Sequence, residues 1–209
     1  MASAQQNNAG MGKDIMDFHA RSELGEKFSK QIFNDLEMWG FNVALNGTEH
    51  TNPYFVGGLK SSEDKTSLMI RFQPDGVASI GNIPRSVYVE AKRSKFIEKN
   101  AYDSYMDLYK IGGIVFVVFG IYDKDNKSLE IKFIDIQELK FIPALTNSKW
   151  PVIDGWISPR SHNNWHLEKQ TFTGSGTPFL QIDQICLIQW SQFKKYAIEC
   201  MKCDNLEPQ

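Results

Sequence analysis

Apolar side chains near the start of the chain recur at intervals of three and four residues. They are Leu24, Phe28, Ile32, Leu36 and Trp39. This spacing gathers them on one stripe and predicts an amphipathic helix over residues 19–39. Gly40 follows as a helix C-cap, and the alternation in residues 41–45 predicts a short strand.

Further along the chain the pattern changes to short strands and two more helices. The run Ile114–Phe119 is apolar at every position, which is typical of a central strand covered on both faces. The order of elements predicts an α/β fold with a mixed central β-sheet flanked by helices. We expect the other strands at 68–73, 86–92 and 129–134, and the other helices at about 97–110 and 184–201.

The length of 209 residues suits one domain. We expect a disordered polar arm over residues 1–18 and a single domain over 19–209. Its core would cover about 20–135 and its C-terminal elaboration about 136–209. Hydrophobic residues make up 42% and charged residues 23% of the chain, which excludes a mainly disordered protein.

Composition also bears on the compartment. No apolar stretch approaches the roughly 18 residues of a membrane-spanning helix, so we expect no membrane partner. Three scattered cysteines do not suggest a disulfide framework, and we expect the reducing cytoplasm. The net charge of −2 excludes a strongly basic protein, but nucleic-acid binding depends on where the charge lies.

The segment with the clearest chemistry lies between residues 72 and 95. Pro74-Asp75 stands before a predicted hairpin, and Glu90-Ala91-Lys92 lies on the strand that returns. Residues i and i+2 of a strand share a face, so Glu90 and Lys92 point the same way. The hairpin can bring Glu90 beside Asp75. Two adjacent carboxylates suit a divalent cation, and a neighbouring ammonium can orient or deprotonate a water.

This combination resembles the PD-(D/E)xK nuclease superfamily, which includes restriction endonucleases and Holliday-junction resolvases. The resemblance implies a restriction-endonuclease-like core and Mg²⁺ or Mn²⁺ as cofactor. It implies that Asp75, Glu90 and the Ala91 carbonyl bind the metal, and that Lys92 serves the nucleophilic water. Many members add a Glu from the first helix; Glu26 is the first choice here and Glu23 the second.

The tripeptide alone is weakly specific, because Glu130-Ile131-Lys132 repeats its pattern on another strand. Only Glu90 follows a Pro-Asp across a hairpin. The alternative interpretation is an ordinary Glu–Lys pair on a solvated strand face.

Basic residues cluster around the motif and are candidates for contacts with DNA phosphates. They are Arg71, Arg85, Arg93, Lys95 and Lys99. The alternative is a set of solvated side chains. Tyr102, Tyr105 and Tyr109 share one face of the next helix; we favour a core role for them over a place in a cleft.

These features predict a metal-dependent endodeoxyribonuclease that acts on double-stranded or branched DNA as a homodimer, with a Holliday-junction resolvase as the leading hypothesis. One alternative is a type II-like restriction endonuclease on the same core. The other is a nuclease-like DNA-binding module that does not cleave.

Overall fold

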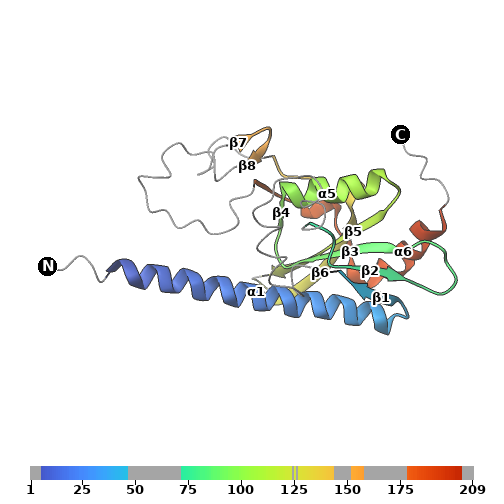
Figure 1. Ribbon diagram of the computed structural model, residues 1–209, viewed down its shortest axis with the longest axis horizontal. Coiled ribbons are helices and arrows are strands. Elements are labelled where there is room, and N and C mark those ends of the chain that lie inside the picture. The colour runs from blue at the N-terminus through green and yellow to red at the C-terminus, as the bar shows by residue number, and fades with distance from the viewer. Residues whose placement is uncertain are drawn as a thin grey trace.

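A six-stranded mixed sheet lies at the centre of the molecule (Figure 1). Its strands stand in the order β1-β2-β3-β5-β6-β10. The β3–β5 pair is parallel and the other pairs are antiparallel. The bounds are β1 Asn42–Leu45, β2 Gly76–Ser79, β3 Val87–Lys92, β5 Ile114–Asp123, β6 Ser128–Asp135 and β10 Ile188–Gln189. The predicted mixed α/β fold is confirmed.

The structure is a computed structural model that describes residues 6–46, 72–123, 125, 127–143, 152–157 and 178–203. Within the first range, the side chains of residues 6–19, 21 and 22 are outside the description. Arg71 and most of the strand predicted at 68–73 also lie outside it. Phe72 and Gln73 are not in a strand, and β2 begins only at Gly76.

Helices cover both faces of the sheet. Helix α1 (Gln6–Met38) and helix α5 (Lys99–Lys110) lie on opposite sides of it (Figure 1). Helix α6 (Phe193–Lys202) packs on the same face as α1. Among the described residues no helix has both the length and the apolar character needed to cross a bilayer.

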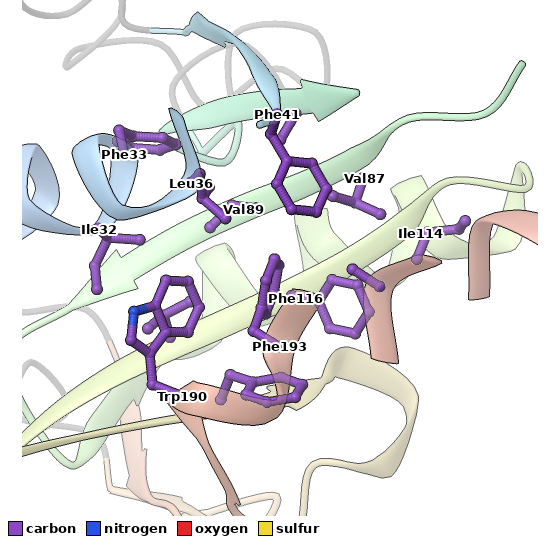
Figure 2. Close-up of a cluster of buried hydrophobic side chains, with 14 of the residues drawn as sticks. Ile32, Phe33, Leu36, Phe41, Val87, Val89, Ile114, Phe116, Trp190 and Phe193 are labelled. Carbon is purple, nitrogen blue, oxygen red and sulfur yellow. The ribbon is translucent and has the colours of Figure 1, made fainter. Parts of the chain in front are cut away.

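The central strand β5 is buried on both faces, as its unbroken apolar run predicts. Phe116 and Val118 face α1 and α6, and Figure 2 shows Phe116 beside Phe193. Val117 and Phe119 face α5. The two hydrophobic clusters thus lie on opposite faces of one strand, because successive side chains of a strand alternate.

A second, four-stranded sheet was not predicted. It has the order β4-β9-β8-β7. Its strands are β4 Phe96–Glu98, β9 Phe179–Gln181, β8 Trp156–Ile157 and β7 Val152–Ile153. Strands of two or three residues are too short to show a recognisable alternation.

Two predicted boundaries are wrong. Helix α1 begins at Gln6, earlier than the predicted start at residue 19. Once a helix is nucleated, each further residue is added at little cost, and no proline interrupts this segment. The last helix begins at Phe193 instead of residue 184, because Ile188 pairs with Phe133 of β6. Short 3₁₀ turns at Ile136–Glu138, Gln184–Cys186 and Trp190–Gln192 complete the described elements.

Candidate active site

The β2–β3 hairpin brings Asp75 and Glu90 together. Gly76 pairs with Val89, so the residues just outside that pair, Asp75 and Glu90, meet at one end of the hairpin. The backbone N–H of Asp75 donates to Oε2 of Glu90 at 3.1 Å. The backbone N–H of Ala91 donates to Oδ2 of Asp75 at 2.9 Å. Each carboxylate is therefore held by the backbone of the other strand.

Gly76 allows helix α1 to approach this end of the hairpin. A Cβ atom at this position would lie 2.7 Å from the ring of Phe33 on α1, which is closer than such atoms approach. Phe33 is itself buried, with 5% of its surface exposed. The absence of a side chain at Gly76 thus sets the distance between α1 and the strand that follows Asp75.

Lys92 lies on the same strand face as Glu90, as predicted. Its Nζ atom is 2.8 Å from Oε1 of Glu90. Burial by itself lowers the pKa of the Lys92 ammonium, but the carboxylates of Glu90, Asp75 and Glu98 raise it, and the net pKa is above the ordinary value. Lys92 is consequently a cation at neutral pH, which suits it to orient a water or stabilise negative charge rather than to remove a proton.

Sequence reasoning missed the contribution of Tyr105. This residue of α5 is buried, as we expected for the tyrosine stripe, and its hydroxyl is hydrogen-bonded to Glu90. Burial, followed by the charge and hydrogen bond of Glu90, raises the pKa of Tyr105 well above its ordinary value. The side chain therefore stays a neutral hydroxyl beside the carboxylate. Its spacing with Tyr102 and Tyr109 indicated one helix face but not which tyrosine reaches the motif.

Glu98 is a second side chain that the sequence did not single out. It ends β4 and is the N-cap residue of α5. Its charge contributes to raising the pKa of both Lys92 and Tyr105. The charges of three carboxylates, those of Glu90, Asp75 and Glu98, therefore act on the Lys92 ammonium, and the first two were predicted.

The structure does not bring the helix carboxylates into contact with the motif. Glu23 and Glu26 are both exposed on α1, and neither forms an ion pair or hydrogen bond with another described residue. Glu26 precedes Phe33 by seven residues, about 10 Å along a helix axis. Its role at the site, and the choice between the two, stay predictions.

Arg85 is not at the candidate site. Its guanidinium donates from Nη1 to the Cys203 carbonyl at 2.6 Å and from Nη2 to the Gly112 carbonyl at 3.3 Å. It precedes β3, whereas Lys92 ends that strand, so the strand separates them by about 20 Å. Arg85 therefore joins the end of α6 to the turn after α5, which proximity in sequence to the motif did not reveal.

The other predicted basic residues follow Lys92. Arg93 and Lys95 are exposed in the turn between β3 and β4. Lys99 forms an ion pair with Asp103, and its Nζ lies 5.8 Å from the ring centroid of Trp156. The basic surface at this end of the sheet thus contains fewer free cationic side chains than the sequence predicted, mainly Arg93 and Lys95.

The donors at the site suit a hard divalent cation. Asp75 and Glu90 present carboxylate oxygens, and Ala91 adds a carbonyl between Glu90 and Lys92. In the described ranges, no three His, Cys, Asp or Glu side chains form a group that could hold a metal. Mg²⁺, however, is commonly bound through one or two carboxylates, with water and substrate phosphate as its other ligands. The residues present fit that mode of binding.

The Tyr105 hydroxyl gives the site a measurable alkaline signature. Because its pKa in the folded protein exceeds the ordinary 10.0, its stabilising contribution is present below pH 10 and is lost as the pH rises through the folded-state value. We expect Tyr105→Phe to remove the tyrosine ionisation that occurs at the highest pH, as followed by ultraviolet absorbance. The substitution should also lessen the decrease in the free energy of unfolding at alkaline pH. The control is Tyr122→Phe, at an exposed tyrosine of β5. Loss of the latest step in Tyr122→Phe, with that step retained in Tyr105→Phe, would contradict the assignment.

Comparison with known proteins finds similarity among solved structures. No family model matches the chain, and no curated protein matches it. Among solved structures, the chain is similar to Archaeoglobus fulgidus Hjc, a Holliday junction resolvase from an archaeal hyperthermophile. The match covers 56% of this chain and 77% of that chain, at 15% sequence identity and a TM-score of 0.37. The roles of the residues are therefore inferred from the site's own geometry.

Proposed function

We propose that this protein is a metal-dependent endodeoxyribonuclease that hydrolyses phosphodiester bonds at Asp75, Glu90 and Lys92. The observation that carries the proposal is the convergence of the three side chains at one end of the hairpin. Asp75 and Glu90 are joined through backbone N–H groups, and the Lys92 ammonium lies 2.8 Å from Glu90. Such a set combines metal ligands with a fixed positive charge, which phosphodiester hydrolysis requires.

Asp75, Glu90 and the Ala91 carbonyl would hold Mg²⁺ or Mn²⁺, with Glu26 as the proposed carboxylate from α1. The bound ion would supply positive charge that polarises the phosphate. Glu90 is only 6% exposed, so its charge acts in a partly dehydrated setting, where electrostatic interactions are stronger.

Lys92 would orient the attacking water and stabilise charge that develops on the phosphate oxygens. Its raised pKa favours this role over removal of a proton. Tyr105 donates its hydroxyl to Glu90 and so orients the carboxylate that lies beside the ammonium. In this arrangement the positive charge is already in place before the substrate binds, which is the basis of electrostatic catalysis.

The leading substrate is double-stranded or branched DNA, cleaved by a homodimer to leave 5′-phosphate and 3′-hydroxyl ends. The resemblance of the Asp75, Glu90 and Lys92 motif to that of the PD-(D/E)xK nucleases supports this choice. The described cysteines, Cys186, Cys200 and Cys203, are free, which suits the cytoplasmic location that we propose.

The function is tested by incubating plasmid and four-way-junction DNA with the protein in Mg²⁺ or in a chelator. We expect cleavage that needs the metal and that disappears in Asp75→Ala. The control is Glu199→Ala, which removes an exposed carboxylate of α6. Junction nicking indicates a resolvase, whereas discrete fragments from long DNA indicate the restriction-endonuclease alternative. Equal cleavage by wild type and Asp75→Ala would exclude Asp75 from the reaction.

A DNA-binding module without cleavage is the second candidate. It is favoured by the fact that the carboxylates already have partners, because both Glu90 oxygens and Oδ2 of Asp75 accept contacts within the protein. Calorimetry separates the two hypotheses. Binding of Mn²⁺ that is lost in Asp75→Ala supports the nuclease, and DNA binding without any Mn²⁺ binding supports the module.

A further inference from the structure

The turn that follows β3 carries two basic side chains and ends at an exposed aromatic ring. Arg93 and Lys95 are exposed, and neither forms an ion pair with another described residue. Phe96, the first residue of β4, is 38% exposed. The Lys95 ammonium lies 5.9 Å from the centroid of the Phe96 ring. Cationic and aromatic groups thus stand side by side directly after the candidate catalytic lysine.

The backbone that carries the Phe96 ring is held in place by hydrogen bonds. Its backbone pairs with Gln181 of β9, and the Ile182 N–H donates to the Lys95 carbonyl at 3.0 Å. Inside the turn, the Ser94 hydroxyl donates to the Phe96 carbonyl at 3.2 Å. A single exposed apolar residue is common on protein surfaces. A side chain whose backbone is restrained on both sides has less conformational freedom to lose, so binding a ligand to it costs less entropy.

The ring also packs against one neighbouring aromatic side chain while 38% of the residue's surface remains exposed. Phe179 of β9 meets it in a T-shaped contact, with ring centroids 5.6 Å apart and an interplanar angle of 85°. This contact leaves part of the residue's surface open to solvent. An exposed aromatic ring beside positive charge is the arrangement on which nucleic-acid bases stack.

The turn lies close to the candidate active site. Phe96 follows Lys92 by four positions, so their Cα atoms are at most about 15 Å apart. Phe96 and Glu98 share one face of β4, because they are separated by two positions, and the charge of Glu98 reaches Lys92. Nucleotides of a strand in duplex DNA are spaced by about 3.4 Å. A strand cleaved beside Lys92 would therefore reach Phe96 within about five nucleotides.

We propose that the segment Arg93–Phe96 binds unpaired nucleotides of the substrate, with a base stacked on Phe96 and phosphates contacting Arg93 and Lys95. This inference rests on the proposed function and narrows its substrate class to DNA that carries a single-stranded extension or flap next to the cleavage point. The nearby aromatic cluster of Tyr102, Phe141 and Trp156 is less suited, because its lysine, Lys99, is paired with Asp103.

The test measures binding without cleavage. Fluorescence anisotropy in the Asp75→Asn background, in the presence of chelator, compares a labelled blunt duplex with the same duplex carrying an unpaired tail. We expect the tailed DNA to bind about tenfold more tightly, and Phe96→Ala to remove that preference while leaving blunt-duplex affinity unchanged, because the loss of one base–aromatic stack has an effect of this order. Arg93→Ala and Lys95→Ala should each reduce the salt dependence of binding to the tailed DNA.

Two further variants control for the possibility that Phe96→Ala simply disrupts the local structure. Phe96→Trp should restore the preference for tailed DNA, since tryptophan also stacks. Ile111→Ala, which removes an exposed apolar side chain beyond the opposite end of β3, should change neither affinity. Equal affinity for blunt and tailed DNA in the protein with the unsubstituted turn would overturn the inference. An equal loss of affinity for both DNAs in Phe96→Ala would overturn it as well. Failure of cleavage alone affects the proposed function and not this result.

Discussion

Replacing Lys92 by methionine should lower the rate of DNA cleavage by about 100- to 1000-fold, the usual effect of removing one charge-stabilising donor from an active site. Methionine keeps an unbranched apolar stem and removes the ammonium. Glu90 would retain the Asp75 N–H and the Tyr105 hydroxyl as partners, so the hairpin should remain folded. Single-turnover cleavage with excess enzyme measures the chemical step directly.

The chain contains a close control for this substitution. Lys132 lies two positions after Glu130 on β6, and its Nζ is 2.7 Å from Oε2 of that residue. Its side chain is 20% exposed, compared with 22% for Lys92. Lys132→Met makes the same change in net charge and breaks the same kind of ion pair, but two strands away from Lys92, with Phe119 of β5 between them. We expect it to keep cleavage near the wild-type rate. A similar loss in both variants would show that total charge, rather than the position of Lys92, governs the reaction.

Substituting Phe116 by alanine should reduce the free energy of unfolding by about 3–5 kcal/mol. Phe116 has no exposed surface and lies on the central strand. Its ring centroid is 5.2 Å from that of Phe193 and 5.8 Å from those of Phe133 and Tyr196 (Figure 2 labels Phe116 and Phe193). Removing the ring leaves a cavity between strands and α6, and this cost adds to the lost burial of apolar surface.

Urea unfolding, followed by circular dichroism, measures this loss. Domains are stabilised by only about 5–15 kcal/mol, so the variant should unfold at a much lower denaturant concentration. Tyr122→Ala provides the control on the same strand, because Tyr122 is 55% exposed and its loss should change stability by about 0.5 kcal/mol or less. Equal destabilisation by the two substitutions would show that Phe116 does not hold the core as the structure indicates.

Local patterns were sufficient for the middle of the fold. Strand β3 at Val87–Lys92 and strand β5 from Ile114 lie where alternation and the unbroken apolar run predict them. The same holds for the pairing of Asp75 with Glu90, because a hairpin joins segments that are near in sequence. A period of two on the returning strand then places Lys92 on the face of Glu90.

Elements that depend on distant partners were not predictable in the same way. Strand β4 exists because it pairs with β9, about 80 residues later, and β10 exists because Ile188 pairs with Phe133. Two or three residues carry too little pattern to reveal such strands. The predicted C-terminal helix was therefore wrong at its start, where pairing with β6 outweighs the local helical spacing.

The candidate site likewise contains residues that local sequence places and residues that only tertiary packing places. The amino-acid sequence alone specified Asp75, Glu90 and Lys92, since their geometry follows from one hairpin and the alternation of a strand. Only the tertiary structure placed Tyr105 and Glu98 around them and Arg85 away from them, because those positions depend on how α5 and α6 pack against the sheet. Hydrophobic burial drives that packing, and the buried face of a helix can be read from its spacing. Which of its side chains meets a given carboxylate is set by the contact between the two elements.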